Sequence, residues 1–196
     1  MKSEEKKITY FKEPGEHNTE KTIELAVDYA KQNDIKTIVI GSATGASALK
    51  LKEKAPDLEV IDVTYSEGVS FKETLEEFKK NQKELEEKGI KIVKCTHAFS
   101  GIDKCIFKKF GTTTPIIIIA ETLKLISEGT KVAVESALMA ADVGSVKQKE
   151  PILALGGTSH GVDTCLLVEP STTSKFFEFG ILEIICIPRH GGLTHG

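Results

Sequence analysis

The sequence has few of the features that mark several large protein classes. Its 196 residues include no tryptophan, three tyrosines and nine phenylalanines. The formal net charge is −3, so no excess of lysine and arginine accompanies these few rings. Nucleic-acid-binding surfaces usually combine a basic stripe with stacking aromatic rings. The composition therefore argues against a nucleic-acid partner.

Long hydrophobic runs are absent as well. No apolar segment approaches the ~20 residues that a membrane-spanning helix needs. The first residues, MKSEEKKITYF, also lack the apolar core of a secretory signal peptide. We therefore expect no membrane partner and a cytoplasmic location.

Residues that commonly bind metals occur without metal-ligand spacing. The four cysteines form no CxxC pair and are Cys95, Cys105, Cys165 and Cys186. In a cytoplasmic chain this pattern predicts reduced and mostly buried thiols. His190 and His195 lie in what we expect to be a loose tail, so we predict no metal site.

What the sequence does contain is an alternation of helical and strand patterns. Asn18 can cap a first helix, since apolar residues then recur at helical spacing, at Ile23, Ala26, Val27 and Ala30. The run KTIVIG follows, and its continuous apolar character is typical of a parallel strand covered on both faces. A second helix is predicted to end at Pro56, and LEVIDVTY to form the next strand.

The segment that begins at Ser70 predicts a long helix. Ser70 and Glu73 have the spacing of a capping box, and Gly89 provides a stop. We expect four apolar residues on the inward face, namely Phe71, Leu75, Phe78 and Leu85. The charged run KKNQKELEEK then forms the solvated face, and IKIVKCTHAF predicts a third strand.

The rest of the chain predicts two helices and three strands. Thr114 and Pro115 begin a helix over IIIIAETLKLISEG that ends at Gly129. Four consecutive isoleucines also suit a strand, but the cap and the apolar spacing favour a helix. Thr130 begins a helix that is apolar nearly all round and should be buried. PILALGG, DTCLLVEP and ILEIICIPRH predict the last strands.

These patterns predict a single α/β domain over residues 1–196. No linker rich in proline, glycine or serine divides the chain, and no internal repeat is present. Alternating helices and apolar strands favour a mostly parallel sheet with helices on both faces.

Four loops rich in glycine, serine and threonine follow predicted strands: GSATGAS, TYSEGVS, THAFSG and GGTSHGVDT. In such a sheet, ligands bind beyond the carboxyl ends of the strands. Backbone amides at a helix N-terminus suit a phosphate, and hydroxyls add donors. GSATGAS is neither a Walker loop nor a GxGxxG fingerprint, and a simple strand-to-helix corner remains an alternative. Four converging loops favour a phosphorylated ligand.

Several ionisable residues lie near those loops, namely Glu67, His97, Asp103, His160 and Asp163. They form no recognised catalytic constellation such as HExxH or GxSxG. His97 can hydrogen-bond a ligand or act as a base, or neighbouring backbone can satisfy it. Asp163 can contact a ligand, or brace the turn around Gly161.

Three stretches together resemble one family. NTEKTIELAVDYAKQNDIKTIVIGSATGASALKLKE resembles the opening of the pyruvate kinase C-terminal (alpha/beta) domain. It is more similar still to stand-alone archaeal and bacterial proteins built from that domain. ETLKLISEGTKVAVESALMAADVG resembles the helical segment of the family, and ALGGTSHGVDTCLLVEPSTTSKFFEFGILEIICIPRH its C-terminal sheet portion. The resemblance covers nearly the whole chain and rests on the order and spacing of these stretches.

The resemblance implies a three-layer α/β/α fold. In full pyruvate kinases this domain carries an allosteric sugar-phosphate site, whose usual loop is not evident here. The 196 residues leave no room for the barrel that binds phosphoenolpyruvate and metal, so we expect a protein that is not a pyruvate kinase. The stand-alone relatives are associated with bound flavin mononucleotide (FMN) and have no established reaction.

The resemblance also implies a cofactor site built from the four loops. Its residues would be Ser42, Ala43, Thr44, Gly45 and Ser47, then Thr64 and Ser66, then Thr96, His97 and Phe99, and finally Gly157, Thr158, Gly161, Asp163 and Thr164. A flavin ring needs an apolar wall, which Phe99, Tyr65 and Ile102 are close enough in sequence to supply.

Two functions remain open from the sequence. The first is a cytoplasmic FMN-binding protein, with oxidoreductase activity as its extension. The second is a non-catalytic sensor or regulatory module for a phosphorylated metabolite. An interaction domain is a third reading, which no feature selects, and the doubly wound architecture leaves homo-oligomer formation open.

Overall fold

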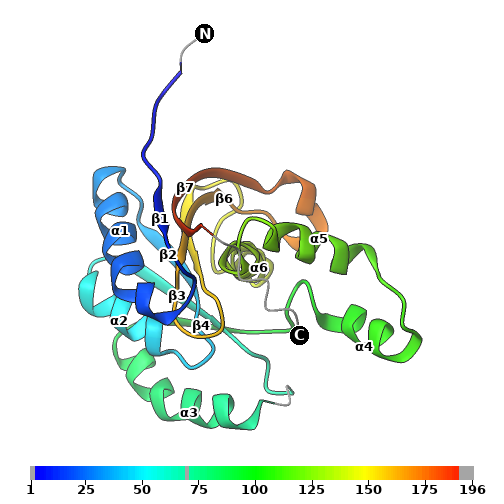
Figure 1. The fold of residues 1–196 in the computed structure, drawn as a ribbon. Coiled ribbons are helices and arrows are strands. Elements are labelled where there is room, and N and C mark those ends of the chain that lie inside the picture. Colours follow the sequence, from blue (N-terminus) through cyan, green and yellow to red (C-terminus); the bar gives the residue numbers. More distant parts are fainter. Residues whose placement is uncertain (1–2, 69–70, 190–196) are drawn as a thin grey trace.

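The fold is built on one seven-stranded sheet. A computed structural model describes residues 3–68 and 71–189 (Figure 1). The strand order is β1-β7-β6-β5-β2-β3-β4, and β6 alone runs antiparallel to its neighbours. The strands are β1 (Thr9–Phe11), β2 (Thr37–Gly41), β3 (Glu59–Thr64), β4 (Lys91–Lys94), β5 (Ile152–Gly156), β6 (Thr164–Glu169) and β7 (Gly180–Pro188). This confirms the predicted mostly parallel sheet.

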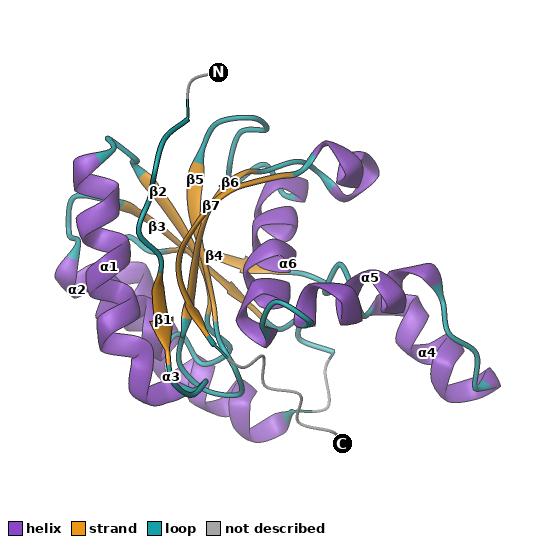
Figure 2. Ribbon diagram, turned by 45° about the horizontal axis from the view of Figure 1, so that its top comes forward, coloured by secondary structure: helices purple, strands orange, loops and turns teal. Residues whose placement is uncertain are grey.

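Helices cover both faces of the sheet, which makes three layers (Figures 1 and 2). On one face lie α1 (Thr19–Gln32), α2 (Ala46–Lys54) and α3 (Lys72–Glu87). On the other lie α4 (Gly101–Phe110), α5 (Pro115–Lys124) and α6 (Glu128–Asp142). Among the described residues there are also two short 3-10 turns, η1 (Glu16–Asn18) and η2 (Thr173–Glu178). No helix among the described residues is long and apolar enough to cross a bilayer.

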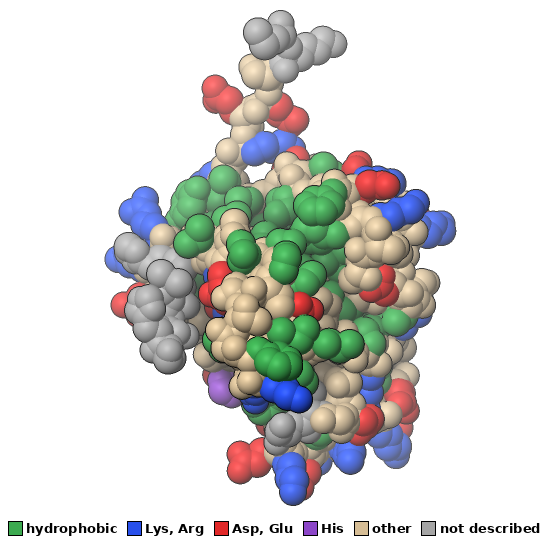
Figure 3. Space-filling view, turned by 90° about the vertical axis from the view of Figure 1, so that its right-hand side faces the viewer, with side chains coloured by type: hydrophobic (Ala, Val, Ile, Leu, Met, Phe, Trp, Pro, Cys, Tyr) green, Lys and Arg blue, Asp and Glu red, His purple; other side chains and the backbone are tan. Residues whose placement is uncertain are grey.

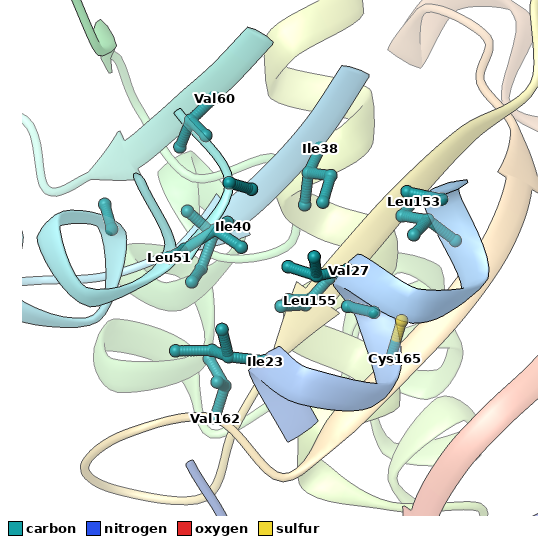
Figure 4. Close-up of a cluster of buried hydrophobic side chains, with 14 of the residues drawn as sticks. Ile23, Val27, Ile38, Ile40, Leu51, Val60, Leu153, Leu155, Val162 and Cys165 are labelled. Carbon is teal, nitrogen blue, oxygen red and sulfur yellow. The ribbon is translucent and has the colours of Figure 1, made fainter. Parts of the chain in front are cut away.

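The side chains of alternate strand residues lie in two hydrophobic cores, one on each face of the sheet. On β2, Ile38 and Ile40 face α1–α3, whereas Val39 faces α6. Figure 4 shows part of the first core, where α1 places Ile23 and Val27 against the sheet. Burying each such side chain contributes about 1.5–3 kcal/mol. This two-sided burial explains why the strand sequences are continuously apolar.

The first predicted helix is confirmed, but its cap is not. The four apolar residues of the predicted inward face of α1 are all buried. Asn18 makes no cap, and its Nδ2 donates instead to the Glu13 carbonyl at 2.8 Å. The reason is that η1 runs directly into α1 and leaves Asn18 in a helical conformation, which an N-cap residue does not have.

The expected position of Phe71 is wrong. Helix α3 begins at Lys72, so Phe71 lies outside the helical rotation and its side chain is 50% exposed. Its ring packs on Tyr65 with 5.2 Å between centroids. Phe78 and Leu85 are buried as predicted, and Ser70 of the predicted capping box lies outside the described residues.

The boundary between α5 and α6 also differs from the prediction. Thr114 caps α5 as expected, accepting from the Ile117 amide at 3.4 Å. However, α5 ends at Lys124, and Ser127 caps α6 by accepting from the Thr130 amide at 2.8 Å. Gly129 therefore opens α6 instead of ending α5. A Cβ at Gly129 would lie 2.3 Å from Thr164 Oγ1, so this close approach requires glycine.

Some elements match only in part or were not predicted. Helix α6 is buried along most of its length, as predicted. The strand β1 and the helix α4 had no counterpart in the sequence-based prediction. All four cysteines are free, but only Cys165 and Cys186 are buried, while Cys95 is half-buried and Cys105 is exposed.

Candidate functional site

The strand order reverses between β2 and β5. From β2 the chain proceeds to β3 and β4 on one side, and it returns at β5 on the other side of β2. Such a reversal opens a crevice at the carboxyl ends of the strands, where α/β proteins bind ligands. Because β2, β3, β4 and β5 are parallel, the topology brings the four loops that follow them to this one edge.

The loop after β2, Ser42–Gly45, is held by hydrogen bonds from the neighbouring elements. Thr64 Oγ1 donates to the Ala43 carbonyl at 2.8 Å, and Asn81 Nδ2 donates to the Thr44 carbonyl at 2.9 Å. Gly45 has a φ of 80°, and a Cβ there would lie 2.6 Å from Leu85. These contacts fix the loop between β3 and α3.

The amides of this loop divide into two groups. The Ala46 and Ser47 amides donate to hydroxyls within the loop, at 3.4 Å to Thr44 and 3.3 Å to Ser42. The Ala43 and Thr44 amides donate to no acceptor within residues 3–68 and 71–189. Ser42 and Ser47 therefore shape the loop, whereas Ala43 and Thr44 present available donors beside the N-terminus of α2.

The loop between β5 and β6 forms a tight turn on the other side of the reversal. Gly157 lies directly against the carbonyl of Gly161. The Val162 amide donates to Thr19 Oγ1 at 3.1 Å, which ties this turn to the start of α1. Thr158 is buried, and its hydroxyl has no hydrogen-bond partner among the described residues. Thr158 thus places an unpaired hydroxyl inside the turn, out of contact with solvent.

Asp163 occupies a structural position. It is fully buried, and its Oδ2 accepts from the Gly15 amide at 2.9 Å. Its Oδ1 accepts from Thr164 Oγ1 at 3.0 Å, and Thr164 also contacts the Ser127 hydroxyl at 3.1 Å. These contacts favour the bracing alternative, because both carboxylate oxygens already join the loop to the turn before α1 and to the start of α6.

A buried charged cluster that the sequence analysis did not identify lies behind His97. Glu135 Oε2 is 3.4 Å from His97 Nδ1 and also pairs with Lys131, while Oε1 accepts from the Phe99 amide at 2.8 Å. Burial alone would raise the pKa of Glu135, but His97 and Lys131 outweigh it and lower the pKa to about 2. Glu135 is therefore an anion that ties α6 to the loop after β4.

Aromatic rings meet at the same edge, though not the expected ones. Tyr65 stacks on His97 with 5.0 Å between centroids and 20° between planes, and Phe71 covers Tyr65. Phe99 is buried against Phe176, and Ile102 is 78% exposed on α4. The wall expected from Tyr65, Phe99 and Ile102 is therefore not assembled.

The remaining predicted residues are more peripheral. Ser66 is half-buried, whereas Thr96 and His160 are exposed. Glu67 pairs with Lys94 at 2.8 Å on the surface, and Asp103 lies in the first turn of α4. His190 and His195 lie outside the described residues. Within residues 3–68 and 71–189, no three His, Cys, Asp or Glu side chains are grouped to hold a metal ion.

A third buried carboxyl, Asp62, lies on β3 below the Ser42–Gly45 loop. It is fully buried and has no hydrogen-bond partner among the described residues. Burial raises its pKa well above the usual value, and the nearby amide of Ser42 offsets this only in part. That amide donates to the Val63 carbonyl at 3.1 Å. Burial thus favours the neutral form of the Asp62 carboxyl over the charged form.

The comparison with known families agrees with this architecture. A family model described as the pyruvate kinase alpha/beta domain matches residues 20–168, well over half of the chain. The matched region runs from α1 into β6 and includes all four loops at the carboxyl edge. The chain thus belongs to the pyruvate kinase alpha/beta domain family.

Proposed function

We propose that this chain binds a phosphorylated small molecule at the carboxyl edge of its sheet, and that the ligand is FMN. The observation that carries this proposal is the pair of available amides at Ala43 and Thr44. They lie where the strand order reverses and beside the N-terminus of α2, so the amides and the positive helix end together suit a phosphate.

The residues present fit the two ends of FMN unequally. The phosphate end fits the Ser42–Gly45 loop, whose amides and hydroxyls are held in place from β3 and α3. For the ring, Tyr65 and the half-exposed Phe71 offer an aromatic surface in place of Phe99. The unpartnered hydroxyl of Thr158 is buried, so it would meet a polar part of the ligand only if the turn around it opened.

Each part of the site has a proposed task. The Ala43 and Thr44 amides would bind the phosphate, and Tyr65 would support the ring. Glu135 lies 3.4 Å from Nδ1 of His97 on one side of the imidazole, and Tyr65 stacks on the ring. When bound, the flavin supplies the electron or hydride transfer of any oxidoreductase activity. The proposal does not include pyruvate kinase activity, since the resemblance assigns phosphoenolpyruvate binding to a separate barrel.

A non-catalytic sensor of a phosphorylated metabolite is the second candidate. It is favoured by the position of Phe99 and Ile102, one inside the core and the other facing solvent. Without these two side chains, the aromatic surface beside the loops is small. A small surface suits a ligand that has no flavin-sized ring. In this case the phosphate would still bind at Ala43 and Thr44, and binding would shift stability without turnover.

The first test is a visible spectrum of the purified chain and of its heat-released supernatant. A flavin spectrum near one per chain supports FMN. Titration of the flavin-free chain should then show FMN binding at least tenfold tighter than riboflavin, which lacks the phosphate. Equal affinity for both would place the phosphate elsewhere.

A colourless chain that also fails to bind added FMN would overturn the flavin assignment. Thermal melts with sugar phosphates and nucleotides would then test the sensor alternative, because a ligand at 100 times its Kd stabilises by about 2.7 kcal/mol. The control is the same panel without the phosphate groups. No shift with any member would overturn the phosphate site itself.

A further inference from the structure

The amides of Ala43 and Thr44 offer hydrogen bonds to a phosphate, but they do not offer a full positive charge. A phosphate monoester carries about two negative charges at neutral pH, whereas backbone amides and a helix N-terminus carry only partial charges. Hydrogen bonds from a charged donor to an anion are roughly twice as strong as those between neutral groups. A lysine beside the Ser42–Gly45 loop would therefore complete the site.

Lys94 lies next to this loop, at the carboxyl end of β4. In the sheet it is the partner of Thr64, whose hydroxyl donates to the Ala43 carbonyl at 2.8 Å. Lys94 Nζ also lies 3.5 Å from Gln82 Oε1 on α3, and the residue before Gln82 is Asn81, which holds the loop. The loop and the ammonium group are thus bound by neighbouring residues of the same two elements, β3 and α3.

The side chain of Lys94 is mostly shielded from solvent, but its acid partner is not. Lys94 Nζ lies 4.6 Å from the centre of the buried Phe78 ring, and the side chain is 23% exposed. Its partner is Glu67, which follows β3 and contacts Nζ at 2.8 Å with 62% of its own side chain exposed. Ion pairs that reach solvent contribute little to stability. Another anion can therefore replace the Glu67 carboxylate.

The acids near Lys94 are compatible with an incoming anion. The hydrogen bond from Lys94 lowers the pKa of Glu67, so this carboxylate is a charged competitor for the ammonium group. Asp62 lies two residues before Thr64 on β3, but burial favours the neutral form of its carboxyl, which repels a phosphate little. The charge that a phosphate has to displace is thus that of Glu67.

Lys131 is less suited to the same task. It lies on α6, on the other face of the sheet, and it pairs with the buried carboxylate of Glu135. Taking a lysine away from a buried carboxylate is costly, whereas the exposed Glu67 is hydrated when it leaves Lys94. Figure 3 views the molecule from the α4–α6 side and shows that hydrophobic side chains gather on that surface. Such a surface does not favour a phosphate.

We propose that Lys94 is the charged ligand of the phosphate at this site, and that the phosphate takes the place of the Glu67 carboxylate when it binds. This inference rests on the proposed function, because it concerns the phosphate of that same ligand, whether FMN or a smaller metabolite carries it. The Ala43 and Thr44 amides would supply hydrogen bonds, and Lys94 would supply the charge. In the ligand-free chain Glu67 holds the ammonium group in position.

The test compares the affinities of the full chain for FMN and for riboflavin, measured by calorimetry. Lys94→Met removes the charge and keeps an apolar side chain over Phe78. We expect it to weaken FMN binding about tenfold or more, while riboflavin binding changes less than twofold. Lys94→Arg keeps the positive charge and should retain most of the preference for FMN. An unchanged preference for FMN in Lys94→Met would overturn the proposal.

Lys91→Met is the matched control. Lys91 lies on the same strand but at its opposite end, where its Nζ is 3.5 Å from the Ser145 carbonyl. This variant changes the net charge by the same amount and should bind FMN as the wild type does. Circular dichroism checks that each variant is folded. An equal loss in Lys91→Met and Lys94→Met would mean that total charge matters and position does not, which would overturn the role of Lys94.

Glu67→Gln tests the exchange of carboxylate for phosphate. Without the competing carboxylate, FMN binding should tighten about two- to fivefold. In the Lys94→Met background the same change should have almost no effect, because no ammonium group is left to release. Weaker binding in Glu67→Gln, or equal tightening in both backgrounds, would overturn the exchange.

Inorganic phosphate separates a failure of this proposal from a failure of the proposed function. At millimolar concentration, and against sodium chloride of equal ionic strength, it should raise the Tm of the wild type and of Lys91→Met more than that of Lys94→Met. If neither FMN nor inorganic phosphate binds the wild type, the proposed function fails and this proposal fails with it. If they bind and Lys94→Met leaves that binding unchanged, only the role of Lys94 fails.

Discussion

On the α1–α3 side of the sheet β3 buries Asp62 without a partner, whereas on the α4–α6 side helix α6 buries Glu135 among three partners. Burial penalises the charged form of both carboxyls. For Asp62 nothing outweighs that penalty, and its pKa rises well above the usual value. For Glu135 the neighbouring His97 and Lys131 reverse the direction. The partners of a buried carboxyl, and not its depth, thus decide its charge.

The largest effect is expected from breaking the Glu135 cluster. Glu135→Ala removes the anion and leaves Lys131 and the Phe99 amide without their buried acceptor. Breaking a buried ion pair from one side typically costs about 3–5 kcal/mol. Urea unfolding should show a loss of this size, with a smaller loss for Glu135→Gln, which keeps an acceptor for Phe99. A loss below ~1 kcal/mol for Glu135→Ala would mean that the cluster does not hold α6 to the loop after β4.

The two carboxyls should also give opposite pH dependences. Because the folded pKa of Glu135 is about 2, below its ordinary 4.5, its stabilising effect is present above pH 4.5 and lost as the pH falls toward 2. The difference in unfolding free energy between wild type and Glu135→Gln should shrink across that range, by up to about 3 kcal/mol. Urea midpoints at several pH values measure it, and a difference that stays constant from pH 5 to pH 2 would contradict the charged assignment.

Replacing Asp62 should change the free energy of unfolding in the opposite direction and by a smaller amount than replacing Glu135. The unfolded chain releases the proton of Asp62 above its ordinary pKa of 3.8, whereas the folded chain keeps this proton to higher pH because its pKa is raised. The free energy of unfolding therefore falls as the pH rises. Asp62→Asn removes this dependence and should stabilise the chain at pH 7 by roughly 0.5–2 kcal/mol. Thermal melts at pH 4 and pH 7 measure it. If Asp62→Asn is destabilising by the same amount at both pH values, the carboxyl is not protonated in the fold.

The same two regions show which parts of this structure can be predicted from the sequence. The apolar runs of β2 and β5 and the all-round apolar α6 predicted buried elements correctly, because burial on both faces leaves a continuous signal in the sequence. The cluster around Glu135 left no such signal. Its partners His97 and Phe99 lie more than 35 residues away, and only the fold brings them together. A lysine four residues before a glutamate on an apolar helix was the one local hint.

Local competition explains other differences between prediction and structure. Gly129 looked like the end of α5, yet Ser127 caps α6 and Gly129 allows Thr164 to approach. The loop residues Ser42 and Ser47 were predicted to bind a ligand, which stays a prediction. In the structure they hydrogen-bond to each other and so shape the loop around the available amides of Ala43 and Thr44. The location of the loops was predictable, but the division of tasks within them depends on hydrogen bonds that spacing does not reveal.

The smallest effect is expected at the partly exposed end of the Glu135 cluster. His97 has a quarter of its side chain exposed, and its Nδ1 lies 3.4 Å from Glu135, farther than a good hydrogen bond. Ion pairs that reach solvent contribute about 0–1 kcal/mol. His97→Gln should therefore lower the unfolding free energy by less than ~1 kcal/mol, because Lys131 and the Phe99 amide still hold Glu135. Lys131→Met is the control at the more buried end and should cost more. If His97→Gln costs as much as Glu135→Ala, the imidazole is the main support of the buried anion, and the contrast with the unpartnered Asp62 rests on His97 alone.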